Sequence, residues 1–219
     1  MESEMPNAFG FSTAPSDGGD FTPIVKYDAR AGRMFRVDRT QDSSGNFASE
    51  AVDVTQTFKA IFGFDHIETG WVRFASGIAP NFKMVPIGNE LPARPSAEHK
   101  NGVRLMIRLA ANCCGDKPIR EMAGTAKAFL AGIEAAYEQY QAEKAEHPGE
   151  LPIMVLEGTK AVKSGAGEKS STNYQPTFVI VGWKECGDLG NRAAMRLDGS
   201  PPATGSTRAG PPKVDDDFG

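Results

Sequence analysis

The stretch VRLMIRL at residues 103–109 decides the fold, because its side chains alternate in character from one residue to the next. The odd-numbered positions are all apolar, whereas the even-numbered ones are Arg104, Met106 and Arg108. Successive side chains of a β-strand point to opposite faces of a sheet. We therefore predict a strand with an apolar core face and a cationic outer face.

Stretches of the same alternating kind lie on both sides of this segment, and each predicts a further strand. They span residues 21–37 (broken at Ala31-Gly32), 52–61, 70–75, 81–85, 151–162 and 174–183. Polar residues 40–50 and the proline-containing residues 91–101 are expected to be loops. The Gly- and Ser-rich residues 163–172 resemble a phosphate loop, but Lys169 follows Glu168 instead of a glycine. We interpret them as a hairpin loop.

One long amphipathic helix is predicted after residue 116. Asp116 is the expected N-cap, and Pro118 suits the first turn because it lacks a backbone N–H. From Ile119 to Tyr140 the apolar residues recur at steps of three and four, which is the spacing of one helix face. This stripe predicts packing against a sheet. The sequence His-Pro-Gly at residues 147–149 ends the helix.

Strands and helices do not alternate along the chain, which argues against a parallel doubly wound sheet. The predicted class is mostly β with one long helix. The simplest match is a five-stranded Greek-key β-barrel with the helix between its third and fourth strands and extra strands in the first hundred residues. A β-sandwich with a helical insertion is the alternative. Residues 1–20 are expected to be a flexible segment, 21–187 one domain, and 188–219 a disordered, acidic-tipped tail.

Charge is unevenly distributed over these parts. The chain has a formal net charge of −4, with −4 in residues 1–20, +1 in residues 21–187 and −1 in residues 188–219. No apolar run approaches the roughly 18 to 20 residues of a membrane span, and residues 1–20 lack the features of a secretory signal. Three cysteines, two of them adjacent, fit a reducing compartment and not a disulfide framework.

The motifs of common enzyme classes are absent from the sequence. It has no Gly-x-Ser-x-Gly elbow, no His-Glu-x-x-His pair and no glycine-rich dinucleotide loop. Its three isolated histidines are a weak basis for acid–base chemistry, and no Cys-x-x-Cys unit offers zinc ligands. We therefore expect no catalysis, no cofactor and no metal. A nuclease with carboxylates brought together by folding remains an alternative.

Basic residues recur beside aromatic ones in the predicted strands. Single-stranded nucleic acid is bound by cations along its phosphates and by flat side chains that stack on its bases. The candidate phosphate contacts are Lys26, Arg33, Arg36, Arg73, Lys83, Arg104, Arg108, Lys160 and Lys163. The candidate stacking residues are Tyr27, Phe35, Trp71, Phe74, Tyr174 and Trp183. For each of them, an ordinary solvated face or a core position is the competing interpretation.

The C-terminal tail ends in Asp215, Asp216, Asp217, Phe218 and Gly219. Three carboxylates next to a phenyl ring are typical of a linear motif, in which the acids are attracted to a basic pocket and the ring anchors the contact. The same tip could occupy the protein's own cationic surface until nucleic acid displaces it. A tail that only increases solubility is the alternative.

Residues 21–37, the last strand NYQPTFVIVGW (173–183) and the tail tip together resemble a phage or prophage single-stranded DNA-binding protein of the oligonucleotide/oligosaccharide-binding (OB) fold. The resemblance implies an OB-like Greek-key β-barrel that coats single-stranded DNA during DNA replication or recombination. It also implies that the tail recruits replication or recombination proteins. One departure is that Gly219 follows Phe218, whereas family tails usually finish on the aromatic residue.

From this resemblance we expect a location in the cytoplasm of a bacterial host cell and no membrane partner. A homo-oligomer is left open. The competing hypothesis is a structural or protein-interaction module of a phage that does not bind DNA.

Overall fold

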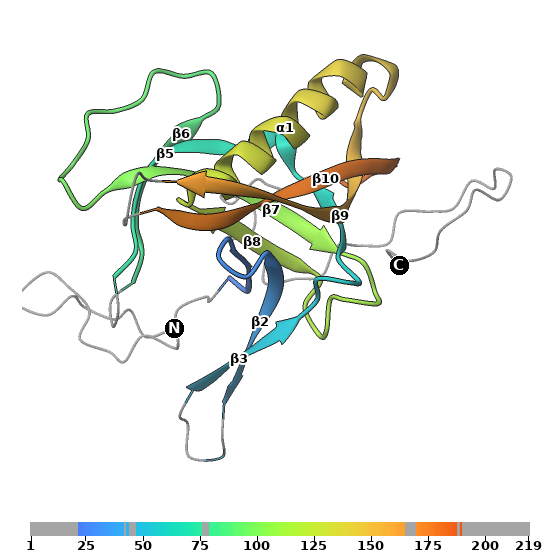
Figure 1. Cartoon of the computed structure of the whole chain (residues 1–219). Helices are drawn as coiled ribbons and strands as arrows, with labels where there is room; N and C mark the ends of the chain where they lie inside the picture. The colour runs from blue at the N-terminus through green and yellow to red at the C-terminus, as the bar shows by residue number, and fades with distance from the viewer. Residues whose placement is uncertain are drawn as a thin grey trace, which may run out of the picture.

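The computed structural model describes residues 22–41, 43, 47–75, 79–164, 170–187 and 189 (Figure 1). Strands predominate, and one long helix accompanies them, as predicted. The strands are β1 (Ile24–Asp28), β2 (Arg33–Gln41), β3 (Phe47–Asp53), β4 (Lys59–Phe62), β5 (Glu68–Arg73), β6 (Asn81–Pro86), β7 (Lys100–Leu109), β8 (Ile119–Gly124), β9 (Glu150–Ser164) and β10 (Ser171–Glu185). The helix is α1 (Lys127–Glu143), and two short 3-10 turns are η1 (Phe64–His66) and η2 (Lys144–Glu146).

The strands form one curled sheet. Its order is β10-β9-β4-β7-β8-β1-β2-β3, and the β5–β6 hairpin pairs with β7 beside this path. Most neighbouring strands are antiparallel, but β1 runs parallel to β8. Figure 1 shows the β2–β3 and β5–β6 hairpins projecting from the sheet as two separate arms. The sheet is an open, half-barrel-like layer that is consistent with an OB-like fold.

The OB-like arrangement is carried by five of the ten strands. Taken in chain order, β4, β7 and β8 precede α1, and β9 and β10 follow it. The helix therefore lies between the third and fourth strands of this set, but the third strand is β8, whose residues the sequence analysis placed in the helix. The additions are the N-terminal strands β1–β3 and the β5–β6 hairpin, all within the first hundred residues.

The core is an aromatic cluster between the sheet and α1. Phe62 is fully buried, and its ring lies 5.3 Å from that of Phe178 and 5.4 Å from that of Phe64. The helix packs closely on β10 at Gly132, where an added Cβ would lie 2.5 Å from a side-chain atom of Pro176. A glycine at this position therefore sets how near the helix can approach the sheet.

The predicted start of the helix is wrong. Residues 119–124, expected in the first turns, form strand β8 between β7 and β1. Pro118 lies at the β7–β8 connection, where its carbonyl accepts a hydrogen bond from the Leu109 amide. The helix begins at Lys127, and Ala126 precedes it without a side-chain cap. A central strand is buried on both faces, so the apolar positions of β8 do not show the alternation of a half-buried strand.

Three further expectations need correction. The predicted strand over residues 52–61 is interrupted, because β3 ends at Asp53, β4 begins at Lys59 and a turn lies between them. Residues 40–50 are not a loop throughout, because β2 extends to Gln41 and β3 begins at Phe47. The even-numbered face of β7 is not an open cationic face, because Met106 is 2% exposed and the Arg104 side chain 15% exposed. The N-terminal segment and the tail beyond Leu189 lie outside the described residues.

The curl of the sheet brings its strand β1 against β10. The Tyr174 amide donates a hydrogen bond of 2.6 Å to the Ala29 carbonyl, and the Tyr27 hydroxyl donates one of 2.9 Å to the Tyr174 carbonyl. Gly32 has a positive φ of 66°, and an added Cβ there would meet the Tyr174 side chain at 3.1 Å. We call this contact between the β1–β2 turn and β10 the closing contact.

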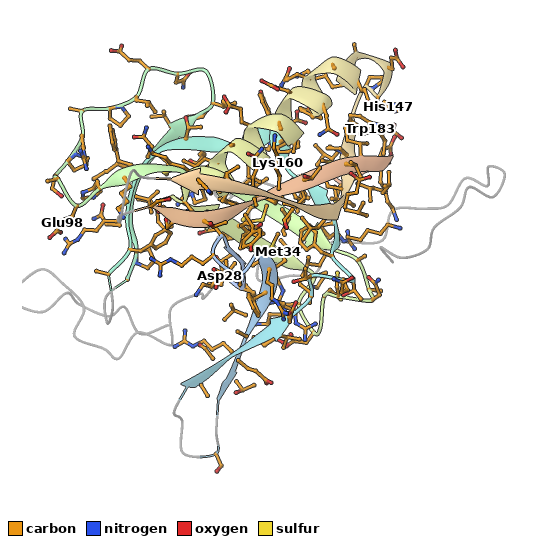
Figure 2. All side chains as sticks on the ribbon, in the orientation of Figure 1. Asp28, Met34, Glu98, His147, Lys160 and Trp183 are labelled. Atoms are coloured by element: carbon orange, nitrogen blue, oxygen red, sulfur yellow. The ribbon has the colours of Figure 1, made fainter. Side chains whose placement is uncertain are left out.

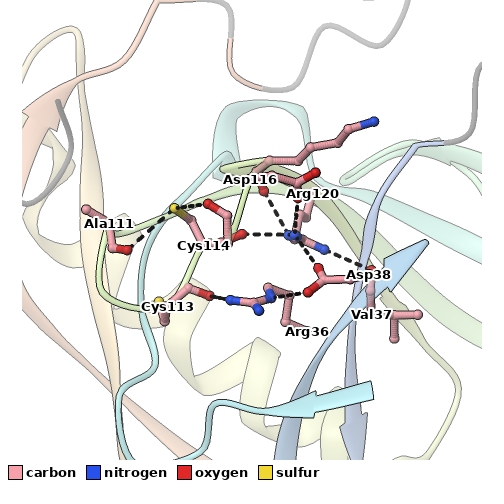
Figure 3. Close-up of polar contacts among 10 residues, drawn as sticks. Arg36, Val37, Asp38, Ala111, Cys113, Cys114, Asp116 and Arg120 are labelled. Carbon is pink, nitrogen blue, oxygen red and sulfur yellow. Dashed lines mark hydrogen bonds and ion pairs between the residues drawn. The ribbon is translucent and has the colours of Figure 1, made fainter. Parts of the chain in front are cut away.

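A buried arginine ties β2 to β8 (Figure 3). Arg120, only 1% exposed, forms a 2.8 Å ion pair with Asp38 and donates hydrogen bonds to the carbonyls of Val37, Cys114 and Lys117. Asp38 also accepts a 2.8 Å hydrogen bond from Arg36. Desolvating a guanidinium costs free energy unless its donors are satisfied, and these acceptors satisfy them.

We expect Arg120→Ala to lower the free energy of unfolding by about 3 kcal/mol, because it leaves Asp38 and several carbonyls without their donor. Urea unfolding followed by circular dichroism measures the change. The matched control is Arg33→Ala, which removes a 2.8 Å ion pair to Asp53 from a side chain that is 60% exposed. That control should cost no more than about 1 kcal/mol. Equal losses in the two variants would contradict the assignment.

Candidate nucleic-acid interface

The predicted arginines are engaged within the protein. Four form ion pairs with carboxylates, at 2.6–2.8 Å: Arg33 with Asp53, Arg36 with Asp38, Arg73 with Glu98, and Arg104 with Glu68. The fifth, Arg108, lies near Cys186, where its positive charge acts to lower the pKa of the thiol against the larger effect of burial. These contacts partly neutralise the cations that the sequence assigned to phosphates.

Arg36 and Arg104 are the most enclosed of the four predicted arginines that form ion pairs. The Arg36 side chain is 16% exposed, and its guanidinium also donates a 3.0 Å hydrogen bond to the Cys113 carbonyl. Arg104 donates two hydrogen bonds to one Glu68 oxygen and lies 4.8 Å from the centroid of the Phe82 ring. Arg104 thus joins β7 to β5, and Arg36 joins β2 to the loop before β8. This placement argues against the phosphate role predicted for both.

The predicted lysines differ from the arginines. Lys26, Lys83, Lys160 and Lys163 are all exposed. Within the part of the chain that the structure describes, none of the four forms an ion pair with a carboxylate. Their ammonium groups are thus available to an anionic ligand.

Two of these lysines are directly opposite an aromatic residue across neighbouring strands. Lys26 of β1 is in register with Phe35 of β2, and Lys83 of β6 is in register with Trp71 of β5. Residues opposite each other in an antiparallel pair project on the same face, with Cβ atoms about 4.5–5.5 Å apart. Each hairpin therefore presents a cation beside a flat ring, as the sequence pattern suggested.

The other two lysines lie on β9 near the closing contact. Lys160 directly precedes Ala161, which is in register with Tyr174 of β10, and Lys163 is in register with Thr172. The two lysines are three residues apart and therefore project on opposite faces of β9. Because the Tyr174 amide binds the Ala29 carbonyl, this part of β9–β10 adjoins the turn that follows Lys26. Figure 2 shows Lys160 on the β9–β10 hairpin and Asp28 in the adjoining β1–β2 region. The closing contact thus places the turn after Lys26 next to β10, the strand that pairs with the lysine-bearing β9.

The predicted stacking residues fall into two groups. Tyr27 packs at 5.9 Å on the Phe129 ring, Tyr174 packs on the β1–β2 turn, and Trp183 stacks at 4.2 Å on His147 (Figure 2). Those three rings serve internal packing, which argues against the role predicted for them. Phe35 is half-buried, and Phe74 is 51% exposed.

Trp71 is partly covered by the loop that follows β6. Its indole N–H donates a 2.7 Å hydrogen bond to the Pro92 carbonyl, and the Arg94 guanidinium lies 5.5 Å from its ring centroid. Arg94 lies in the segment predicted as a loop, and no local sequence pattern indicates its contact with Trp71. Two exposed cations were also missed, Arg30 in the β1–β2 turn and Lys100 at the start of β7.

Nothing in the described part of the chain assembles a metal site, because no three or more His, Cys, Asp or Glu side chains gather there. Burial raises the pKa of the Cys113 and Cys186 thiols, which disfavours the nucleophilic thiolate. Among the described residues, no helix has the length and apolarity needed to cross a bilayer.

The tail motif at residues 215–218 lies outside the described residues. Just before the tail, Leu189 is 3% exposed and belongs to the hydrophobic core. Its amide donates a hydrogen bond to the Cys186 carbonyl. The folded part thus includes Leu189, two residues beyond the predicted end of the domain.

Comparison of the chain with protein-family models, with curated proteins and with solved structures finds no match.

The Tyr27 hydroxyl makes the closing contact sensitive to high pH. Burial, with a smaller contribution from the Asp28 charge, raises the pKa of Tyr27 to about 12. In the unfolded chain this hydroxyl ionises near pH 10. The stabilisation is therefore fully present below pH 10 and is lost as the pH rises from 10 to 12. We expect the free energy of unfolding, measured in urea, to fall over that range.

Tyr27→Phe is the control, because phenylalanine cannot ionise and the other titrating groups are unchanged. It should lose about 1 kcal/mol at neutral pH with the hydrogen bond, and its stability should fall less steeply between pH 10 and 12. Parallel curves for the two proteins would show that Tyr27 ionisation does not control stability there.

Proposed function

We propose that the chain binds single-stranded DNA without sequence preference and protects it during phage or prophage DNA replication or recombination. The observation that carries this proposal is the pairing of Lys26 with Phe35 and of Lys83 with Trp71 in two separate hairpins. In both pairs the lysine is exposed and has no ion pair within the described residues. The site of action is the cytoplasm of a bacterial host cell, and no catalytic step is assigned.

A cation beside a ring matches the chemistry of a single strand. Each nucleotide offers a phosphate that an ammonium can neutralise and a base whose face can stack on an aromatic side chain. A stacked base contributes about 1–3 kcal/mol, whichever base it is. Such contacts favour tolerance of sequence and a preference for single strands, because duplex bases are already stacked on one another.

We assign DNA contacts to fewer residues than the sequence suggested, because the ion-paired arginines and the internally packed rings are left out. Lys26 of β1 and the β9 lysines Lys160 and Lys163, which lie on opposite faces of their strand, form the main cationic group around the closing contact, and Phe35 is the ring opposite Lys26. Lys83, Trp71 and Phe74 on the β5–β6 hairpin form a second group. The ion-paired arginines instead stabilise the strands that carry these residues, since a paired guanidinium would have to exchange its carboxylate for a phosphate.

The acidic tail is proposed to compete with DNA for the cationic group and to recruit replication or recombination proteins. Residues 198–219 carry Asp198 and three consecutive aspartates against Arg208 and Lys213. Carboxylates are attracted to the lysines that the proposal assigns to phosphates, and salt weakens this attraction. The tail would therefore lower affinity at low salt without altering the folded domain.

The direct test is anisotropy of a fluorescently labelled oligo-dT titrated with the full chain at low and moderate salt. A label on the DNA is preferable to intrinsic fluorescence, because Trp183 is half-buried and already stacked on His147. We expect binding that weakens with salt and is weaker for a duplex of equal length. No binding at low salt with micromolar protein would refute the proposal and favour a phage protein-interaction module.

The matched variants are the triple change Lys26→Ala, Lys160→Ala, Lys163→Ala and the single change Lys144→Ala. Each phosphate contact contributes about 0.7 to the slope of log affinity against log salt for single strands. The triple variant should therefore bind more weakly and lower the slope by about 2. Lys144 follows α1, and its ammonium lies over the Tyr140 ring, so its loss should leave DNA affinity unchanged. Equal effects would contradict the assigned surface.

Removing residues 198–219 should tighten binding to oligo-dT severalfold at low salt, if the tail competes for the lysines. The truncation starts well after Leu189, because that side chain belongs to the core. A variant with Asp215, Asp216 and Asp217 changed to Asn keeps the length and removes the charge, and it should tighten binding in the same direction. Unchanged affinity in both proteins would exclude self-competition while leaving DNA binding intact.

A further inference from the structure

A pocket of about 390 Å³ lies between α1 and the β5–β7 part of the sheet. Leu130 and Ile133 of the helix form one wall, and Ile87 and Leu91 of the loop after β6 border it. Both loop residues are among the large apolar side chains that remain exposed, at 36% and 44%. A concave apolar surface of this size is typical of a binding site.

The helix side of this pocket is acidic. Glu134 and Glu138 line it, are exposed, and form no ion pair within the described residues. They are four residues apart on one helix, a spacing at which like charges repel and destabilise the helix slightly. A ligand with apolar groups and two cations would cover the apolar walls and relieve this repulsion.

The same charges exclude nucleic acid as the occupant. Phosphates would meet two uncompensated carboxylates at the pocket rim, and no predicted DNA-contacting lysine lines it. The pocket is thus chemically distinct from the lysine-bearing surface at the closing contact.

The chain carries a segment with the complementary chemistry directly after its last described residue. Residues 191–197 read NRAAMRL, with Arg192 and Arg196 four residues apart and apolar Met195 and Leu197 beside them. The segment has two positive charges and no negative one. Its arginines thus have the same spacing in the chain as Glu134 and Glu138.

The point at which this segment leaves the fold is near the pocket. The Leu189 carbonyl adjoins Gly63, where an added Cβ would lie 2.5 Å from its oxygen. Ile67, four residues after Gly63, lines the pocket. Four residues span at most roughly 14 Å, and the six from Leu189 to Met195 can span roughly 20 Å. The segment is long enough to reach the pocket.

We propose that residues 191–197 dock intramolecularly in the pocket between α1 and β5–β7, with Met195 and Leu197 on its apolar walls and Arg192 and Arg196 on Glu134 and Glu138. This inference does not depend on DNA binding. Its consequence is that the tail is anchored on the helix side of the protein, so that residues 198–219 are the part free to reach a partner or the lysines.

Limited trypsin digestion of the full chain tests the proposal, because Arg192 and Arg196 are cleavage sites inside the segment and Arg208 is one outside it. Mass spectrometry gives the initial cleavage rate at each site, and a synthetic peptide of residues 188–219 gives the intrinsic ratios. Proteolysis follows the open population, so a segment docked about nine-tenths of the time gives about tenfold protection at Arg192 and Arg196 relative to Arg208.

Two pocket variants test whether the protection of Arg192 and Arg196 from trypsin arises in the pocket. Glu134→Lys with Glu138→Lys reverses the rim charge, and Leu91→Ser removes an exposed apolar contact; both should return the ratios to those of the peptide. Glu143→Lys, an exposed position on the same helix outside the pocket, should keep the protection. Peptide-like ratios in the unaltered chain would overturn the proposal, as would protection that survives both pocket variants. Protection that grows with protein concentration would assign the occupant to a second copy and would overturn the intramolecular form.

Discussion

The hydrogen bond from the Tyr174 amide to the Ala29 carbonyl is the constraint on which the rest of the structure depends. In the sheet order, four strands lie between β10, which carries Tyr174, and β1, which ends one residue before Ala29. The contact is therefore made only if the sheet curls, and the curl encloses the aromatic core around Phe62 and Phe178. Tyr27 adds a second hydrogen bond at the same place and packs on Phe129 of the helix. Sheet curvature, helix position and the proximity of β1 to β9–β10 thus have one common origin.

Arginines and lysines have different roles in this fold because their charged groups differ in geometry and hydration. A guanidinium presents several donors in a fixed plane and can satisfy a carboxylate and carbonyls from neighbouring strands together. Arg120 does so between β2 and β8, and Arg36 does so between β2 and the loop before β8. An ammonium on a flexible stem is strongly hydrated and remains at the surface. The candidate interface therefore consists of lysines on strands whose geometry arginines help to maintain.

Most strands and the β9–β10 hairpin could be predicted from the sequence, because side-chain alternation is typical of a half-buried strand. The start of the helix could not, because β8 is buried on both faces and Ile119 and Met122 fit a helical spacing equally well. The carboxylate partners of the arginines could not be predicted from the sequence either. Asp38 and Arg120 are 82 residues apart, and Glu68 and Arg104 are 36 apart. The sequence therefore located the cations of the candidate site but could not show which of them the fold neutralises.

Net charge is a poor guide to binding in this protein because opposite charges lie on different elements. The residues 21–187 have a net charge of only +1. In the described part of this stretch, arginine charge is largely cancelled by nearby carboxylates, whereas the exposed lysines of β1, β6 and β9 and the exposed glutamates of α1 are not cancelled locally. Screening limits the interaction of exposed charges to about 10 Å at ordinary ionic strength. Each surface therefore acts on a ligand largely by itself, and a chain with a small net charge can present one surface suited to phosphates and another suited to arginines.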